Sequence, residues 1–349
     1  MRRKKISKKT LPSWRKAIQD RKSKQLRLFV KWACLFLGIF LLVNFFIEVF
    51  KNVRFSSWDG KEQFSLVIVE PESVLLLVLK PEIPELVLVK APGNTVVDGA
   101  LGFGEVKIGS LTGLAEIEPI PIDELVLETV KQNFGVPVEG FLQVEKRGED
   151  LRTIFFLGLI RQNRAARTNL TRLELIRVLW FLKGLRVDQI QIFDLKETRG
   201  LVLQKQPDGS EIYKINREEF DIFINRYFSN QQLVDEEITW EVFNATGQAG
   251  LAEMVARLLK NSGSMVVGVG TLEKAGKVGP DVVKAMTGKR VGKVGKEERS
   301  GLWVEKELKD SYGVGFWSLI LGLSVIEGLP EEARADAAIV LGEDFWEKI

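Results

Sequence analysis

The feature that most constrains this chain is an apolar segment at residues 28–50. Its 23 positions contain three strongly polar side chains, Lys31, Asn44 and Glu48. An α-helix rises about 1.5 Å per residue, so the segment reaches roughly 34 Å and can cross a hydrocarbon core of about 30 Å. The segment therefore predicts one membrane-spanning helix, with Lys31 and Glu48 near its ends, where long side chains reach the interface.

The flank before this segment predicts its orientation. Residues 1–27 carry twelve Lys or Arg against one acid, Asp20. Positively charged flanks stay in the cytoplasm, so we expect the bulk of the chain outside the cell. The apolar run is too long for the core of a cleaved signal peptide, and residues 44–53 offer no cleavage pattern, which favours a retained anchor. Anionic lipid is a simpler partner for the basic run than nucleic acid.

Charge and missing residue types restrict what the exported part can do. Residues 1–51 carry a net charge of +12 and the whole chain carries +3, so the remainder is at −9, which argues against nucleic acid as a partner. The chain has no histidine, and its one cysteine, Cys34, lies in the apolar segment. Ser-His-Asp and Cys-His catalysis and zinc sites built on His or Cys are thereby excluded.

A bound metal would be a hard ion such as Mg²⁺ on carboxylate oxygens. Asp98, Asp123 and Glu124 are candidates, but their spacing follows no ligand pattern, and scattered surface acids are far more common.

Turn signals and apolar runs predict a first group of elements in residues 64–228. The predicted strands are 64–69 and 74–79, which form a hairpin, then 86–89, 141–144, 153–157, 190–193 and 200–204. The predicted helices are 122–134, which stops at Gly135-Val136-Pro137, then 169–185 with Asn169 as its N-cap, and 218–228.

A second group follows a polar link at residues 229–237. A strand at 238–243, a turn at 244–247, a helix at 251–261 and a strand at 266–269 read as a βαβ unit. The remaining predictions are a basic Gly-spaced loop at 270–301 with one helix at 280–286, a buried element at 316–326 that fits strand or helix, a short helix at 330–335 and a strand at 337–341.

Motifs at both ends of this second group resemble the LytR C-terminal domain. Residues 241–252 read EVFNATGQAGLA, residues 266–270 read VVGVG, and residues 335–344 read ADAAIVLGED. The three motifs stand in the order of that domain, whereas residues 272–329 depart from it.

The central part resembles the catalytic domain of the LytR-CpsA-Psr family. Residues 65–79 are similar to its paired opening strands, and ETVKQNFGVPV at 128–138 resembles its helix and Gly-hydrophobic-Pro turn. Family members hold a polyprenyl pyrophosphate with arginines, use aspartates and Mg²⁺, and transfer a glycopolymer to peptidoglycan. Such chemistry depends on positioning and charge neutralisation.

The sequence departs from the family at its functional positions. The opening strands usually end in Pro-Arg-Asp, and here the chain reads Leu79-Lys80-Pro81-Glu82. The later pattern, Asp, two residues, Arg, two residues, Arg, Gln, falls on Asn169, Arg172, Leu175 and Ile176. Leucine cannot replace a guanidinium that grips phosphate, and asparagine lacks the charge that a carboxylate gives to Mg²⁺. The resemblance therefore implies a domain without catalytic residues.

Two groups of residues remain as candidate sites. Arg161, Arg164, Arg167 and Arg172 form either a residual anion or pyrophosphate pocket or the solvated face of a helix. The turn with Asn244, Thr246, Gly247 and Gly250 precedes a helix and either binds an anion or is structural.

These observations predict an α/β (α+β) protein in which a mixed-sheet domain and a small βαβ-type domain follow one transmembrane helix. The expected parts are a cytoplasmic tail (1–27), the helix (28–50), a connector (51–63), a degenerate LytR-CpsA-Psr-like domain (64–228), a linker (229–237) and a LytR C-terminal-like domain (238–349).

The resulting function hypothesis is a membrane-anchored, non-catalytic protein that binds or scaffolds at the bacterial cell wall. Its expected partners are membrane lipid, peptidoglycan, wall glycopolymer or wall-synthesis proteins, with no cofactor. One alternative is a phosphotransferase that moves a glycopolymer from polyprenyl pyrophosphate to peptidoglycan with Mg²⁺, and another is an envelope-related transcriptional attenuator.

Overall fold

The computed structural model describes residues 31–32, 39–40, 56, 58–117, 120–144, 150–161, 167–272 and 300–346. The basic tail, most of the apolar segment, Arg164 and the helix predicted at 280–286 lie outside these residues. Among the residues described, no helix is long and apolar enough to span a membrane.

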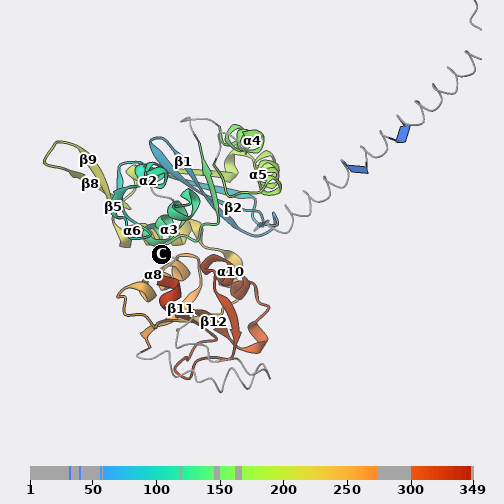
Figure 1. Cartoon of the computed structure of the whole chain (residues 1–349), viewed down its shortest axis with the longest axis vertical. Coiled ribbons are helices and arrows are strands. Elements are labelled where there is room, and N and C mark those ends of the chain that lie inside the picture. The colour runs from blue at the N-terminus through green and yellow to red at the C-terminus, as the bar shows by residue number, and fades with distance from the viewer. Residues whose placement is uncertain are drawn as a thin grey trace, which may run out of the picture. The chain divides into compact units, whose positions relative to one another are not determined.

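A five-stranded mixed sheet, sheet A, forms the centre of the first part of the fold (Figure 1). Its order is β6 (Gly140–Gln143), β1 (Phe64–Glu70), β2 (Ser73–Lys80), β3 (Glu85–Pro92) and β7 (Ile190–Asp194). β1, β2 and β3 are antiparallel neighbours, while β6 and β7 run parallel to the strands that they flank. The hairpin and the strand after it confirm the sequence prediction.

Both faces of sheet A are covered, which explains why its strands are almost continuously apolar. One face packs on α4 (Leu151–Arg161) and α5 (Arg172–Gly184), which lie side by side. The other face packs on α2 (Leu111–Ile117), α3 (Ile122–Phe134) and α6 (Arg217–Phe228). A small sheet B, in the order β5 (Gly104–Lys107), β4 (Thr95–Gly99), β9 (Glu211–Ile215) and β8 (Leu201–Lys205), adds to this second core.

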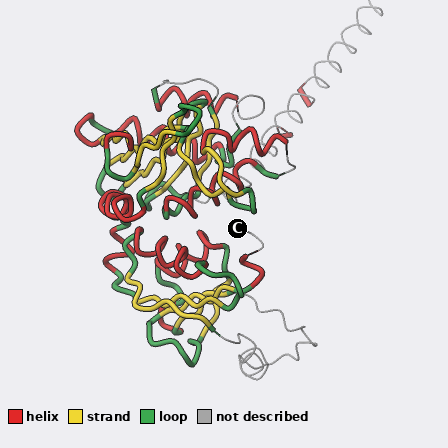
Figure 2. The backbone as a smooth tube through the Cα atoms, turned by 90° about the vertical axis from the view of Figure 1, so that its left-hand side faces the viewer, coloured by secondary structure: helices red, strands yellow, loops and turns green. Residues whose placement is uncertain are grey.

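A third mixed sheet, sheet C, follows in the chain. Its order is β11 (Met265–Thr271), β10 (Thr239–Asn244), β14 (Ala337–Leu341), β12 (Gly301–Val304) and β13 (Ser324–Glu327). The helices α8 (Leu251–Asn261) and α10 (Tyr312–Leu321) cover one side of it, and a short α11 (Glu343–Trp346) closes the described chain (Figure 2). β10, α8 and β11 form the predicted βαβ unit with parallel strands.

Several predicted elements are wrong in type or boundary. Residues 153–157 belong to α4 rather than to a strand, because a short apolar run has no period that separates the two. The helix after it begins at Arg172, and its N-cap is Thr171 rather than Asn169, with a capping box to Glu174. Residues 330–335 form no helix, and the link at 229–237 contains the short helix α7 (Gln231–Asp235).

The element left undecided at 316–326 is both types in succession. α10 ends at Leu321, Gly322 adopts a left-handed conformation as its C-cap, and β13 begins at Ser324. Four strands were not predicted, namely β4, β5, β9 and β12. The last of them starts at the end of the predicted loop 270–301.

Candidate functional site

A cavity of about 270 Å³ lies between the start of sheet A and α10. We call it the aromatic–carboxyl cavity, since its walls carry three aromatic rings and two carboxyl groups. It is lined by Trp58, Glu62, Gln63, Glu139, Ser311, Tyr312, Gly315, Phe316 and Leu319. Segments distant in the sequence therefore meet at one concave surface with apolar walls and a few polar groups, as ligand sites commonly do.

Glu139 is the electrostatically unusual group of this cavity. Burial raises the pKa of its carboxyl from 4.5 to about 8, a nearby Lys131 opposes the rise, and Glu62 adds to it. Burial also raises the pKa of the Glu62 carboxyl. A carboxyl that keeps its proton near neutral pH can donate a hydrogen bond as well as accept one, and strongly shifted groups in a cavity mark functional candidates.

The helix α10 is fixed at its first turn, so the aromatic wall of the cavity is held in place. The Glu236 carboxylate accepts hydrogen bonds from the backbone N–H groups of Tyr312 (2.6 Å) and Gly313 (2.7 Å). A negative charge is favourable there because the N-terminus is the positive end of the helix dipole. Asn230 donates from Nδ2 to the Tyr312 hydroxyl at 2.8 Å. Burial raises the pKa of the Tyr312 phenol, so this side chain is neutral.

A second cavity of about 280 Å³ lies between α3, α8 and the end of α10. The acidic and basic side chains of its wall come from α3: Glu124, Glu128 and Lys131. Lys131 donates to Glu128 at 2.8 Å and to the Ile320 carbonyl at 3.3 Å, so its ammonium group is already used. Leu319 lines both cavities.

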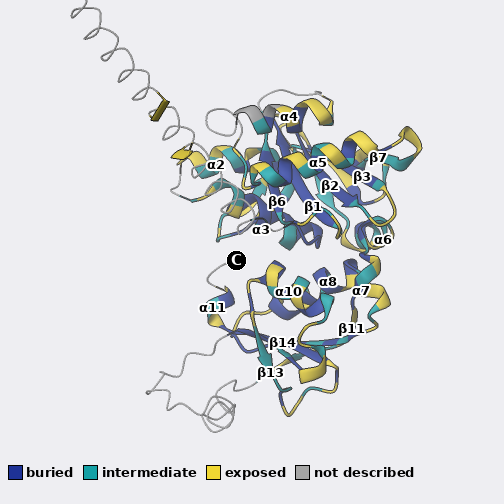
Figure 3. Ribbon diagram, turned by 90° about the vertical axis from the view of Figure 1, so that its right-hand side faces the viewer, coloured by how far each residue is buried: buried dark blue, intermediate teal, exposed yellow. Residues whose placement is uncertain are grey.

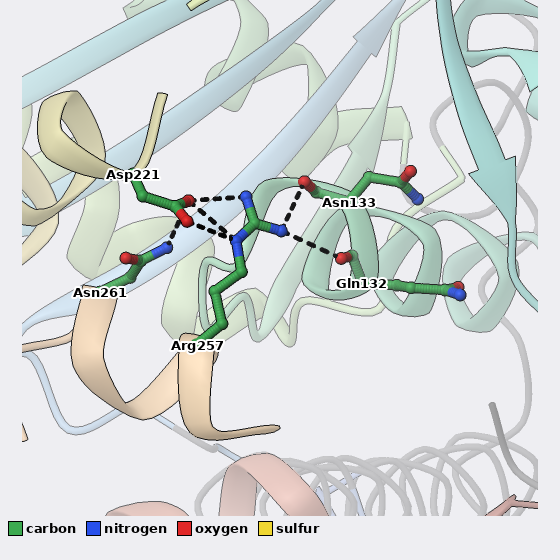
Figure 4. Close-up of polar contacts among 5 residues, drawn as sticks. All are labelled: Gln132, Asn133, Asp221, Arg257 and Asn261. Atoms are coloured by element: carbon green, nitrogen blue, oxygen red, sulfur yellow. Dashed lines mark hydrogen bonds and ion pairs between the residues drawn. The ribbon is translucent and has the colours of Figure 1, made fainter. Parts of the chain in front are cut away.

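Arg257 of α8 joins this helix to α6 by a bidentate ion pair and to α3 by two carbonyl contacts (Figure 4). Its guanidinium contacts the Asp221 carboxylate of α6 at 2.6 and 2.8 Å. It also donates to the carbonyls of Asn133 (2.9 Å) and Gln132 (3.4 Å) at the C-terminal end of α3, where a cation is favoured. Asn261 adds a hydrogen bond to Asp221 at 3.1 Å, and this group of contacts is called the Arg257 clamp below.

Gly135 is required where α3 meets the Arg257 clamp. It caps α3 with a φ of +60°, and a Cβ there would lie 2.6 Å from Asn261 Nδ2. Glycine alone adopts this conformation without strain and leaves room for the contact. Gly135 thus both ends α3 and leaves space for the side chains of the Arg257 clamp.

The arginines singled out from the sequence take different places. Arg161 is the last residue of α4, and Arg172 is the exposed first residue of α5. Arg167 is exposed and pairs with Glu116 of α2 at 3.0 Å. An anion pocket made of these four arginines thus stays a prediction.

Asn169, at the position of a family aspartate, holds a strand. Its Oδ1 accepts from the Phe141 backbone N–H at 2.7 Å, and its Nδ2 donates to the Glu139 carbonyl at 2.8 Å. A carboxylate cannot donate, so an amide fits this place where an aspartate would not. Asn169 thereby fixes the start of β6 beside the Glu139 carboxyl.

The turn after β10 is built on the side chain of Asn244. Its Oδ1 accepts from the backbone N–H and the hydroxyl of Thr246 (2.9 and 2.7 Å), and its Nδ2 donates to the Gln248 carbonyl at 2.6 Å. Gly247 is exposed, and Gly250 precedes α8 with a φ of +86°. The polar groups of Asn244 are thus used within the turn.

The acids proposed for Mg²⁺ do not assemble. Asp98 lies on β4, where its backbone N–H donates to Asn133 Oδ1 and its carbonyl accepts from Asn133 Nδ2, while Asp123 and Glu124 lie in the first turn of α3. Within the described ranges, no group of three acidic side chains is placed to hold a metal ion. The residues present there do not fit the Mg²⁺ site that the family resemblance implies.

Sequence reasoning missed the aromatic–carboxyl cavity. Glu62 belongs to the predicted polar connector, and Glu139 lies between the predicted turn at 135–137 and a strand. Tyr312 precedes the undecided element at 316–326, and Phe316 is its first residue. No local pattern joins these residues, because their proximity arises from the packing of α10. The only signal was the presence of a carboxyl between Pro137 and a strand.

No protein-family model matches the chain, and no curated protein matches its sequence. Among solved structures, TagT of B. subtilis is 11% identical over 48% of this chain and 89% of its own, with a TM-score of 0.35. TagU of B. subtilis is 13% identical over 47% and 94%, with a TM-score of 0.34. TagV of B. subtilis is 9% identical over 59% and 99%, with a TM-score of 0.37. These similarities extend over 48%, 47% and 59% of this chain, respectively.

Proposed function

We propose that this chain is a membrane-anchored protein of the bacterial cell envelope that binds a wall glycan in the aromatic–carboxyl cavity and does not transfer it. The observation that carries the proposal is the composition of this cavity, with the partly exposed rings of Tyr312 and Phe316 beside the carboxyls of Glu62 and Glu139. Sugar rings present flat C–H faces that pack on aromatic rings, and their hydroxyls pair with carboxyl groups.

The size and charge of the cavity suit a segment of a neutral glycan. Its volume, about 270 Å³, lies just below the roughly 300–1,000 Å³ of typical ligand pockets, so it suits a short segment. One wall carries a carboxyl that stays protonated near neutral pH, so the cavity offers both a donor and acceptors to hydroxyl groups. A pyrophosphate would instead require cationic side chains there.

The proposal also rests on the sequence resemblances and on the use that the chain makes of Asn169. The amide at this family aspartate position holds β6 through two hydrogen bonds, which supports a binding role over transfer. The anchor itself, at residues 28–50, is part of the proposal, as is the placement of the bulk of the chain outside the cell.

Cosedimentation tests the proposal. The full chain in neutral detergent is mixed with purified peptidoglycan, and the bound fraction is compared for wild type, Phe316→Leu and the control Trp346→Leu, at an exposed aromatic residue outside the lining of both cavities. An aromatic contact is worth about 1 kcal/mol, so we expect Phe316→Leu to weaken binding about fivefold, with no change for the control. Failure of the wild type to sediment with peptidoglycan, or equal binding by the Phe316 variant, would contradict the proposal.

A further inference from the structure

The outer face of α5 combines apolar and basic side chains in one stripe. Arg172, Ile176, Trp180 and Lys183 follow one another at steps of four, four and three residues, which places them along one side of the helix. Figure 3 shows exposed bands on α5 and on α4 beside it. Trp180 is 73% exposed and Ile176 40%, although such side chains are usually buried.

The neighbouring helix α4 extends this stripe into a surface. Phe156 of α4 is 53% exposed, and Arg152 donates to the Leu182 carbonyl of α5 at 3.0 Å. Lys183 lies 5.8 Å from the centre of the Trp180 ring. We call the surface made by Arg152, Phe156, Arg172, Ile176, Trp180 and Lys183 the α4–α5 face. A large exposed apolar patch with a charged rim marks an interaction site.

The chain that follows the predicted anchor is tied to the same helix. The Trp58 backbone N–H donates to the buried Glu174 carboxylate at 3.1 Å, and Arg177 donates to the Trp58 carbonyl. The Trp58 ring also stacks on Phe64 at 4.9 Å. α5 therefore holds the connector at residue 58, on the flank of the stripe.

If residues 28–50 span a membrane, the length of the connector at residues 51–57 limits the distance between α5 and the lipid surface. Seven residues, 51–57, separate the end of the apolar segment, at Phe50, from Trp58, which makes eight steps from residue to residue. A fully extended chain spans about 3.5 Å per residue, so this connector reaches at most roughly 28 Å. A span at residues 28–50 would keep the edge of α5 within that distance of the lipid surface.

We propose that the α4–α5 face lies on the surface of an anionic lipid bilayer. Tryptophan and phenylalanine favour the interface between headgroups and acyl chains, and Arg172 and Lys183 match anionic headgroups in charge. Asp188, an acid just beyond the end of α5, is paired with Arg186 at 2.9 Å, which limits its repulsion of the headgroups. This docking goes beyond the proposed function, because it involves neither the aromatic–carboxyl cavity nor glycan.

Site-directed fluorescence on the full chain tests this docking. Cys34→Ser removes the one cysteine, and Ile176→Cys then carries an environment-sensitive dye. The matched control is Ile222→Cys on α6. Ile222 is 67% exposed, and α6 packs on the opposite face of sheet A from α4 and α5. Both proteins are placed in lipid discs that contain nitroxide-labelled lipid, with phosphatidylglycerol or with phosphatidylcholine alone.

We expect the nitroxide to quench the dye at position 176 in the anionic discs and to leave position 222 bright. Each basic side chain adds about fivefold to association with an anionic surface, so Arg172→Glu with Lys183→Glu lowers docking at least about 25-fold and removes the quenching. Equal quenching at both positions, or none at position 176, overturns the proposal.

Discussion

Replacing Glu139 by glutamine should make the protein more stable at high pH and leave it unchanged at low pH. The carboxyl has a pKa of about 8 in the folded chain and 4.5 as an ordinary value, with burial as the largest cause. Between these two pH values the unfolded chain has lost the proton while the folded chain keeps it, so the free energy of unfolding falls as pH rises. Below pH 4.5 both states hold the proton, and the penalty is absent.

The size of the effect follows from the shift. At pH 7, about 2.5 units above the ordinary pKa, the unfolded chain has ionised this carboxyl and the folded chain keeps it protonated. Holding the proton in the folded state therefore costs about 3 kcal/mol of stability. Glutamine keeps an oxygen acceptor and a donor at the same place but never ionises. The variant Glu139→Gln should therefore gain about 3 kcal/mol at pH 7, somewhat more at pH 8, and nothing at pH 4.5.

Urea unfolding of the full chain in neutral detergent, at pH 4.5, 6 and 8, measures this gain. The matched control is Glu197→Gln, an exposed carboxyl outside both cavities, which should shift stability by less than about 0.5 kcal/mol at every pH. Equal stability of Glu139→Gln and wild type at pH 8 would refute the reasoning, because it would mean that the Glu139 carboxyl is solvated. A loss of stability at all three pH values would show that the carboxyl is ionised and paired.

Three further predictions concern contacts near the cavities. Their effects on stability are measured by urea unfolding, and the third is also assayed for glycan transfer. Arg257→Ala should cost about 3 kcal/mol, since it leaves the Asp221 carboxylate without its partner, and a cycle with Asp221→Ala should show strong coupling; additive effects would contradict the ion pair. Gly135→Ala should cost more than Gly209→Ala, because both glycines have positive φ but no atom lies within 4 Å of a Cβ at Gly209; equal costs would deny the clash with the clamp. Asn169→Asp should destabilise by about 1 kcal/mol and give no transferase activity, since the carboxylate cannot donate to the strand before it; a stabilised or active variant would contradict a structural role.

The elements that sequence could predict are those with a clear period and a local stop. The helix at 122–134 has one apolar face and ends at Gly135, which the structure holds in the left-handed conformation. The hairpin of β1 and β2 follows from two apolar runs around a short turn. The sequence predicts a strand within α4 because the residues of this helix are apolar on most sides, so the period that identifies a helix is weak.

The candidate site was beyond sequence reasoning because it depends on tertiary packing. Trp58, Glu139 and Tyr312 come from three distant segments, and none belongs to a recognisable motif. A family pattern makes the arginines candidates for binding an anion, yet Arg167 forms an ion pair with Glu116 in the structure. Asn169 shows how one residue can be read from the sequence as a lost catalytic position and from the structure as a strand support.

The central claim is that the protein binds a wall glycan without transferring it. The most direct test incubates the full chain with labelled polyprenyl-pyrophosphate glycan, peptidoglycan and Mg²⁺, and measures label before and after denaturation. We predict label that is held by the wild-type protein and fully released by denaturant. Label that stays covalently in peptidoglycan, and disappears with Arg172→Ala, would contradict the account and show that the chain is a transferase.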